Sequence, residues 1–156
     1  DLQRMKQSFG AGMILLPAAT IIGTLLFSAA GVFLLGDRSL TDCLALGSGF
    51  GYYSLSSVLI ADMKGAAPDA AELATIALLA NIIREMSALF GASLFACWGG
   101  RYAPISVAGI NSMDVCLPTI VREAHDKDVV PLAVTHGMAL EVSVPILIGI
   151  FCGGFF

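Results

Sequence analysis

The segment LLANIIREMSALFGA, residues 78–92, places Asn81, Arg84, Glu85 and Ser87 inside a run that is otherwise apolar. Asn81, Arg84 and Glu85 follow an i, i+3, i+4 spacing, which aligns the three side chains along one stripe of a helix. A charged group at the centre of a bilayer costs at least ~2.5–3.5 kcal/mol. The stripe is therefore expected to face other protein segments or a water-filled cavity.

The composition around this segment is that of a membrane protein. Of the 156 residues, 57% are hydrophobic and 13% are charged, whereas a soluble domain carries about 25% charged residues. A helix needs about 20 apolar residues to cross the hydrocarbon core. The sequence predicts a single all-α polytopic membrane domain over residues 1–156, with the lipid bilayer as its surroundings. Its apolar blocks are residues 9–35, 40–61, 71–97, 104–121 and 129–155.

Two of these blocks are interrupted near their centres. The sequence GSGFG places Gly47, Gly49 and Gly51 in the second block, and AGINSMD places Gly109 in the fourth. Glycine weakens a helix by about 0.5–1 kcal/mol, and half-helices of about ten residues reach the middle of the bilayer. We expect three full transmembrane helices plus two discontinuous or re-entrant helical hairpins that enter from opposite faces. Five full crossings are the alternative.

Helix ends and topology follow from polar residues at the block boundaries. Asp69 is expected to cap the third block while Glu72 reaches back. Asn111 or Ser112 is expected to cap the half-helix after the second break.

Arg38, Lys64 and other charges between blocks are read as solvated. With either topology the basic residues place the N-terminal end inside and the C-terminus outside.

Polar residues within the blocks are the candidates for function. A carboxyl group at mid-membrane depth has a readily shifted pKa and can carry a proton or bind a cation. Each candidate also has a structural alternative to a functional role. The stripe could form a structural ion-pair network, and Asp114 could cap a helix. His136 could be a hydrogen-bonded residue of the core. The candidates for substrate or proton binding are Glu85, Asp114, Arg84, Asn81, Ser112 and Asn111, and those for a proton relay are His136 and Glu141.

Other classes of protein are disfavoured. The four cysteines are scattered without a CxxC pair, and the two histidines lack ligand-like neighbours, so no metal site is expected. An intramembrane aspartyl protease needs two catalytic aspartates, and only Asp114 qualifies. An intramembrane serine protease is a minor alternative, which would need a nucleophile-elbow context around Ser54 or Ser112 with His136 in reach. We therefore expect no catalytic residue and no enzyme. The net charge of −4 disfavours nucleic acid as a partner.

Four motifs occur in an order and spacing that resembles the lysine exporter family typified by LysO. They cover most of the chain from Gly47 onward, and they are GFGYYSLSS (49–57), NIIRE (81–85), NSMDVCLP (111–118) and HGMAL…VP (136–145). By position, Glu85 and Asp114 match intramembrane acids of the family. Glu141 departs from the pattern, since a small hydroxyl residue is usual there. The chain resembles only the C-terminal membrane half of these exporters.

The resemblance implies an inner-membrane exporter of L-lysine, and of related basic amino acids, that works as a proton-coupled antiporter without a cofactor. It implies that an N-terminal half is supplied by another segment, by a small membrane partner subunit, or by dimerisation with a second copy. Glu85 and Asp114 would hold ammonium groups or the coupling proton, and Arg84 with backbone N–H groups would attract the α-carboxylate. The alternatives are a secondary transporter of another solute or ion, and a non-transporting assembly subunit.

Overall fold

The computed structural model describes residues 10–153 except 11, 35, 37 and 66, and over these residues it is a bundle of helices without a β-strand. The predicted all-α class is confirmed. In chain order the elements are α2 (Gly12–Ala30), η1 (Gly31–Phe33), α3 (Leu40–Gly47), α4 (Tyr53–Lys64), α5 (Ala70–Gly99), α6 (Ala103–Ala108), η2 (Gly109–Met113), α7 (Leu117–Ala124), η3 (Lys127–Val129) and α8 (Val130–Cys152).

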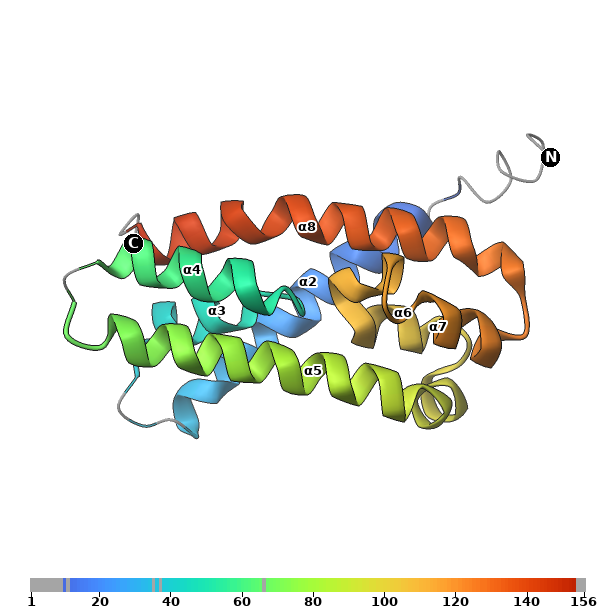
Figure 1. Cartoon of the computed structure of the whole chain (residues 1–156), viewed down its shortest axis with the longest axis horizontal. Helices are drawn as coiled ribbons and strands as arrows, with labels where there is room; N and C mark the ends of the chain where they lie inside the picture. The colour runs from blue at the N-terminus through green and yellow to red at the C-terminus, as the bar shows by residue number, and fades with distance from the viewer. Residues whose placement is uncertain (1–9, 11, 35, 37, 66, 154–156) are drawn as a thin grey trace.

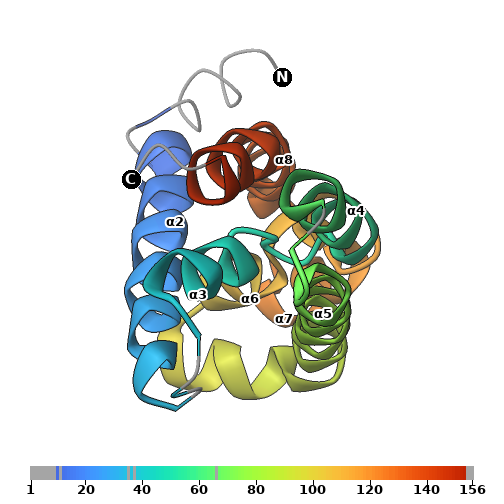
Figure 2. The ribbon, with the colours of Figure 1, turned by 90° about the vertical axis from the view of Figure 1, so that its left-hand side faces the viewer.

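Three stretches of helix within the described ranges are long and apolar enough to cross a membrane: Gly12–Phe33, Ala70–Gly99 and Lys127–Cys152. They correspond to α2 with η1, α5, and η3 with α8, as the first, third and fifth apolar blocks predict. Pro17 and Pro145 lie inside α2 and α8, which membrane helices tolerate because neighbouring segments satisfy the freed backbone groups. Figure 2 looks along the bundle, with α3 inside the ring formed by α2, α8, α4 and α5.

The two interrupted blocks each fold back on themselves. Lys64 at the end of α4 pairs with Asp42 at the start of α3, and Arg101 just before α6 pairs with Asp126 just after α7. The two ends of each pair of half-helices therefore lie at the same end of the bundle. In Figure 1 the α3–α4 pair fills one half of the bundle and the α6–α7 pair fills the other, and their tips meet in the middle.

Each pair of half-helices has its own apolar core. The α3–α4 half packs around Phe50, Ile60, Leu73, Leu140 and Val144, and the α6–α7 half packs around Ile105, Cys116, Ile120, Val129 and Ala133. Beyond Leu73, α5 contributes small side chains to these cores, Ala77 to the first and Ala88 to the second, and Ala92 of α5 is also buried. Small residues allow backbones to approach closely where lipid gives no hydrophobic driving force.

The predicted helix caps are wrong. Asp69 is the N-cap residue of α5, but its side chain makes no capping hydrogen bond, because both it and Glu72 pair with Arg38. Neither Asn111 nor Ser112 caps α7, which begins at Leu117 after Cys116. The second break is longer than predicted, since η2 and a turn separate α6 from α7. Asp69 and Glu72 are thus engaged by a partner distant in sequence.

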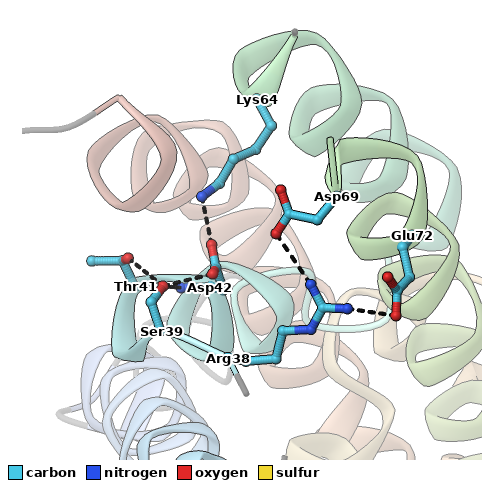
Figure 3. A network of polar contacts seen from close by, with 7 residues as sticks. All are labelled: Arg38, Ser39, Thr41, Asp42, Lys64, Asp69 and Glu72. Atoms are coloured by element: carbon cyan, nitrogen blue, oxygen red, sulfur yellow. Dashed lines mark hydrogen bonds and ion pairs between the residues drawn. The ribbon is translucent and has the colours of Figure 1, made fainter. Parts of the chain in front are cut away.

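Two of the charges predicted to be solvated, Arg38 and Lys64, instead take part in ion pairs that link α3, α4 and α5 (Figure 3). Arg38 pairs with Asp69 and Glu72, and Lys64 donates to Asp42, which also accepts from the Ser39 hydroxyl. Burial would raise the pKa of the Asp42 carboxyl, but hydrogen bonds from Lys64 and Ser39 outweigh it and lower that pKa. The hydrogen bond to Asp42 in turn raises the pKa of Lys64. Both groups are therefore charged, and they hold the ends of the α3–α4 hairpin together.

Replacement of Lys64 is expected to destabilise the protein more than replacement of Asp42. The Asp42 side chain is 9% exposed and that of Lys64 is 21% exposed. The Asp42 carboxylate without its partner is therefore less able to regain contact with water than the Lys64 ammonium group without its partner. We expect Lys64→Gln to lower the stability by about 1–3 kcal/mol and the added change Asp42→Asn to restore part of it. Thermal unfolding in detergent measures this, and a double variant as unstable as the sum of the single ones would contradict it.

Candidate functional site

The tips of the two hairpins are joined by their backbones. The amide of Ile110 donates to the carbonyl of Phe50 at 3.0 Å. Phe50 is fully buried and has a positive φ of 46°, a conformation that a bulky residue adopts only where its surroundings enforce it. Gly109 has a φ of +64°, and a Cβ there would lie 2.1 Å from the Phe50 carbonyl oxygen. The breaks thus form one junction that requires glycine.

Asn81 of α5 supports the first break from the side. Its Oδ1 accepts from the Gly51 amide at 2.7 Å, and its Nδ2 donates to the Ser56 hydroxyl and to the Ala77 carbonyl. The amide is buried. A Cβ at Gly49 would collide with Asn81, so glycine allows the break to lie against this side chain. The backbone donor that the break frees is therefore satisfied within the protein.

Arg84 supports the second break. Its Nε and Nη2 donate to the carbonyls of Val107 and Ser106, both at 2.9 Å. These carbonyls lie in the last turn of α6, where carbonyl groups lack helical partners. Its guanidinium also lies 5.9 Å from the centre of the Phe50 ring, within the range of a cation–π contact. Arg84 therefore binds the α6 terminus and the tip of the other hairpin together.

Arg84→Lys is expected to destabilise the protein although it keeps the charge. An ammonium group cannot reproduce the planar fork that reaches two carbonyls and the ring, and each charge-assisted hydrogen bond is worth about 1.5–3 kcal/mol. The matched control is Arg122→Lys, because the Arg122 side chain is 70% exposed and pairs with its neighbour Glu123. Melting temperatures in detergent compare the two, and equal shifts would contradict a bridging role for Arg84.

A second buried network lies behind the junction. The Ser112 hydroxyl donates to the Ala133 carbonyl at 2.9 Å and lies 3.2 Å from His136 Nδ1. On the other side of the ring, His136 Nε2 lies 3.0 Å from the hydroxyl of Thr20. His136 is fully buried. It therefore joins η2 and α8 to α2, and both ring nitrogens have hydroxyl partners.

A cavity of about 210 Å³ opens where α4, α5, η2 and α8 meet. Three carboxyl groups from different elements line it: Glu85 of α5, Asp114 after η2, and Glu141 of α8. The remaining lining residues are Gly51, Tyr52, Tyr53, Ser54, Ile110, Asn111, Met113 and Val115. Its volume lies below the ~300–1,000 Å³ of pockets for drug-sized ligands, so the cavity suits a small solute.

Asn111, one of the residues that line this cavity, has an unused hydrogen-bond donor. The residue is 8% exposed, and its Nδ2 has no hydrogen-bond partner among the described residues. A buried donor without a partner costs about 1–3 kcal/mol, and each such group in a native structure calls for an explanation. The cavity is thus lined by three carboxyl groups and by a residue with a free donor, which is a set suited to a zwitterionic or cationic ligand.

A larger cavity of about 750 Å³ lies at one end of the bundle, between the start of α2 and the residues around η3. Its charged lining residues are Arg101, Asp126 and Asp128, and two of these already form an ion pair. Charges at the end of a membrane bundle can remain in water. We therefore place the candidate site at the smaller cavity, where charges lie at mid-bundle.

The comparison with known families agrees with the sequence motifs. A family described as "Lysine exporter LysO" matches residues 1–152. The chain belongs to this family. No solved structure matches this member of the lysine exporter family.

Two curated relatives are similar to this family member. One is named "Lysine exporter LysO", from Escherichia coli K12; it is 32% identical, with 90% of this chain and 44% of the relative covered. The other is named "Putative lysine exporter", from Haemophilus influenzae; it is 30% identical, with 88% of this chain and 67% of the relative covered. This chain therefore spans about half the length of the first relative.

The structure separates the predicted site residues into three groups. Glu85, Asp114, Asn111 and Glu141 line the cavity with Gly51. Asn81 and Arg84 hold the backbone of the breaks, together with Gly49 and Gly109, while Gly47 packs against Ser28 of α2. Ser112 and His136 form the buried network with Thr20.

Sequence reasoning missed Tyr53 and Ser54 as cavity residues and Thr20 as a partner of His136. Their position directly after GSGFG is a signal for the first two, because residues at the start of a half-helix lie at the break. Nothing in the sequence near Thr20 indicates its partner, since His136 is more than a hundred residues away and the contact depends on how α2 packs on α8.

Proposed function

We propose that this chain carries the substrate and proton site of an L-lysine exporter, and that the exporter is a proton-coupled antiporter of the inner membrane. The observation that supports this most directly is the mid-bundle cavity lined by Glu85, Asp114 and Glu141, with the free amide donor of Asn111. The names of the two relatives also support an amino-acid exporter.

The chemistry of lysine suits this set of groups. Lysine has two ammonium groups and one carboxylate, so a site for it needs acids at two points and a donor at a third. In our proposal two of the three cavity carboxylates take the ammonium groups, and Asn111 Nδ2 donates to the α-carboxylate. Arg84 was predicted to attract that carboxylate, but its Nε and Nη2 donate to Val107 and Ser106, and Arg84 does not line the cavity. Asn111 does line it, so we propose Asn111 as the partner of the α-carboxylate.

Proton coupling follows from the same carboxyl groups. A carboxyl group that holds a proton is neutral and no longer attracts an ammonium group, so protons and lysine compete for Glu85 and Asp114. Export against a gradient then results if protons displace lysine at the outer face and are released at the inner face. We also propose that the two pairs of half-helices are re-entrant hairpins, with the C-terminus outside, so that their tips place the breaks at mid-membrane depth.

Uptake of labelled L-lysine by everted vesicles tests this function. The vesicles contain this chain together with the remaining part of the exporter, and their interior is made acidic. We expect lysine uptake that stops when an ionophore collapses the pH gradient. Excess unlabelled leucine, which lacks the ε-ammonium group, is expected to compete poorly. Absence of lysine uptake under a maintained gradient would contradict the proposal and favour another solute or an assembly role.

A further inference from the structure

The three cavity acids lie at the middle of the membrane-spanning part of the protein. Glu85 is at the centre of α5 and Glu141 at the centre of α8, judged from the bounds of these helices. Asp114 follows η2 at the tip of the second hairpin, and Figure 1 shows both tips between α5 and α8 at mid-bundle. These carboxyl groups are therefore far from the water at either end of the spans.

The mouth of the cavity is nevertheless open. Asp114 and Glu141 are exposed, and so are Tyr53 and Val115, with exposed fractions of 40% and 52%. Each carboxylate left uncovered at this depth would contact lipid, at a free-energy cost of at least ~2.5–3.5 kcal/mol. The surface at Phe27 of α2 and Phe90 of α5 differs, because these two residues are apolar and are 80% and 84% exposed. The cavity mouth is thus an exposed surface of the bundle that does not suit lipid.

We propose that this mouth is the docking surface for a membrane segment from the part of the exporter that residues 1–156 do not match. The first relative is more than twice as long as its matched part, because only 44% of it is covered. A segment of that remainder would shield Asp114 and Glu141 from lipid and close the cavity. The site is therefore completed by the other half of the transporter.

A second copy of this chain suits the mouth poorly. Two identical subunits related by a two-fold axis present the same patch to each other, so Glu85, Asp114 and Glu141 would face the same three acids of the copy. Like charges separated by a few ångströms repel strongly in a medium of low dielectric constant. The covering segment is instead expected to bring polar or basic side chains.

Photo-crosslinking in native membranes tests the docking surface. The photoreactive residue p-benzoylphenylalanine is placed at Val115 or at Tyr53, with Phe27 and Phe90 as matched controls that are exposed and apolar. Peptides in each adduct are identified by mass spectrometry in the complete transporter. We expect adducts at Val115 and Tyr53 to contain peptides from outside residues 1–156 that align with the unmatched part of the relatives, and adducts at Phe27 to contain lipid.

Three outcomes would overturn this inference: adducts of Val115 and Tyr53 with lipid, adducts with a second copy of residues 1–156 at twice the chain mass, or no protein adduct at either position. The inference rests on the depth and exposure of the acids and not on transport. Crosslinking is therefore expected to persist in a Glu85→Gln variant that transports nothing, so failure of the proposed function and failure of the docking surface give different results.

Discussion

Gly109→Ala is expected to eliminate the folded protein. The φ of +64° at this residue is unfavourable for any residue with a Cβ, and the added Cβ would lie 2.1 Å from the Phe50 carbonyl oxygen and 3.3 Å from Arg84 Nη2. Because the obstacle is backbone, a rotamer change cannot relieve it. Strain of this kind costs about 1–3 kcal/mol before the steric contact is included, which is a large part of a typical folding free energy of 5–15 kcal/mol.

Size-exclusion chromatography in detergent measures the yield of monodisperse protein for this variant. The matched control is Gly23→Ala in α2, where a Cβ would meet nothing within 4 Å and alanine improves helix propensity by about 1 kcal/mol. We expect normal yield from the control and aggregated or degraded protein from Gly109→Ala. A monodisperse, thermally normal Gly109→Ala protein would mean that the two hairpin tips are not joined as described.

Glu85→Gln is expected to abolish proton-coupled lysine uptake while the protein remains folded. The substitution preserves the size of the side chain and removes the group that, in our proposal, alternates between a proton and an ammonium group. Glu85 makes no ion pair among the described residues, so loss of its charge removes no such contact. Uptake should fall to the level of vesicles without the protein, at an unchanged melting temperature.

The matched control for this variant is Asp62→Asn, which removes an acid from an exposed position of α4 that does not line the cavity. We expect its uptake to equal that of the unmodified chain. Asp114→Asn should behave like Glu85→Gln, because its carboxyl group lines the same cavity. Normal lysine uptake by Glu85→Gln would remove this residue from the coupling mechanism, and normal uptake by Asp114→Asn would favour the assembly-subunit alternative.

The sequence by itself determined the class of the protein and the positions of its breaks. Hydrophobic blocks long enough to span a bilayer predict α2, α5 and α8, because a spanning segment must satisfy its backbone groups within its own helix. The glycines of GSGFG and the polar residues of AGINSMD mark the interruptions after α3 and α6. The sequence predicts these two interruptions because each depends on local backbone preferences. The family motifs are also local, and the match over residues 1–152 agrees with them.

The tertiary structure decided what each polar residue does. Arg84 and Glu85 are adjacent on α5, yet one binds the carbonyls of α6 and the other lines the cavity, because neighbours on a helix point about 100° apart. Arg38 engages Asp69 and Glu72, the residues predicted to cap α5. Partners of this kind lie tens of residues apart in the chain. Local preferences do not encode them, and only the packing of the two hairpins between the long helices brings them together.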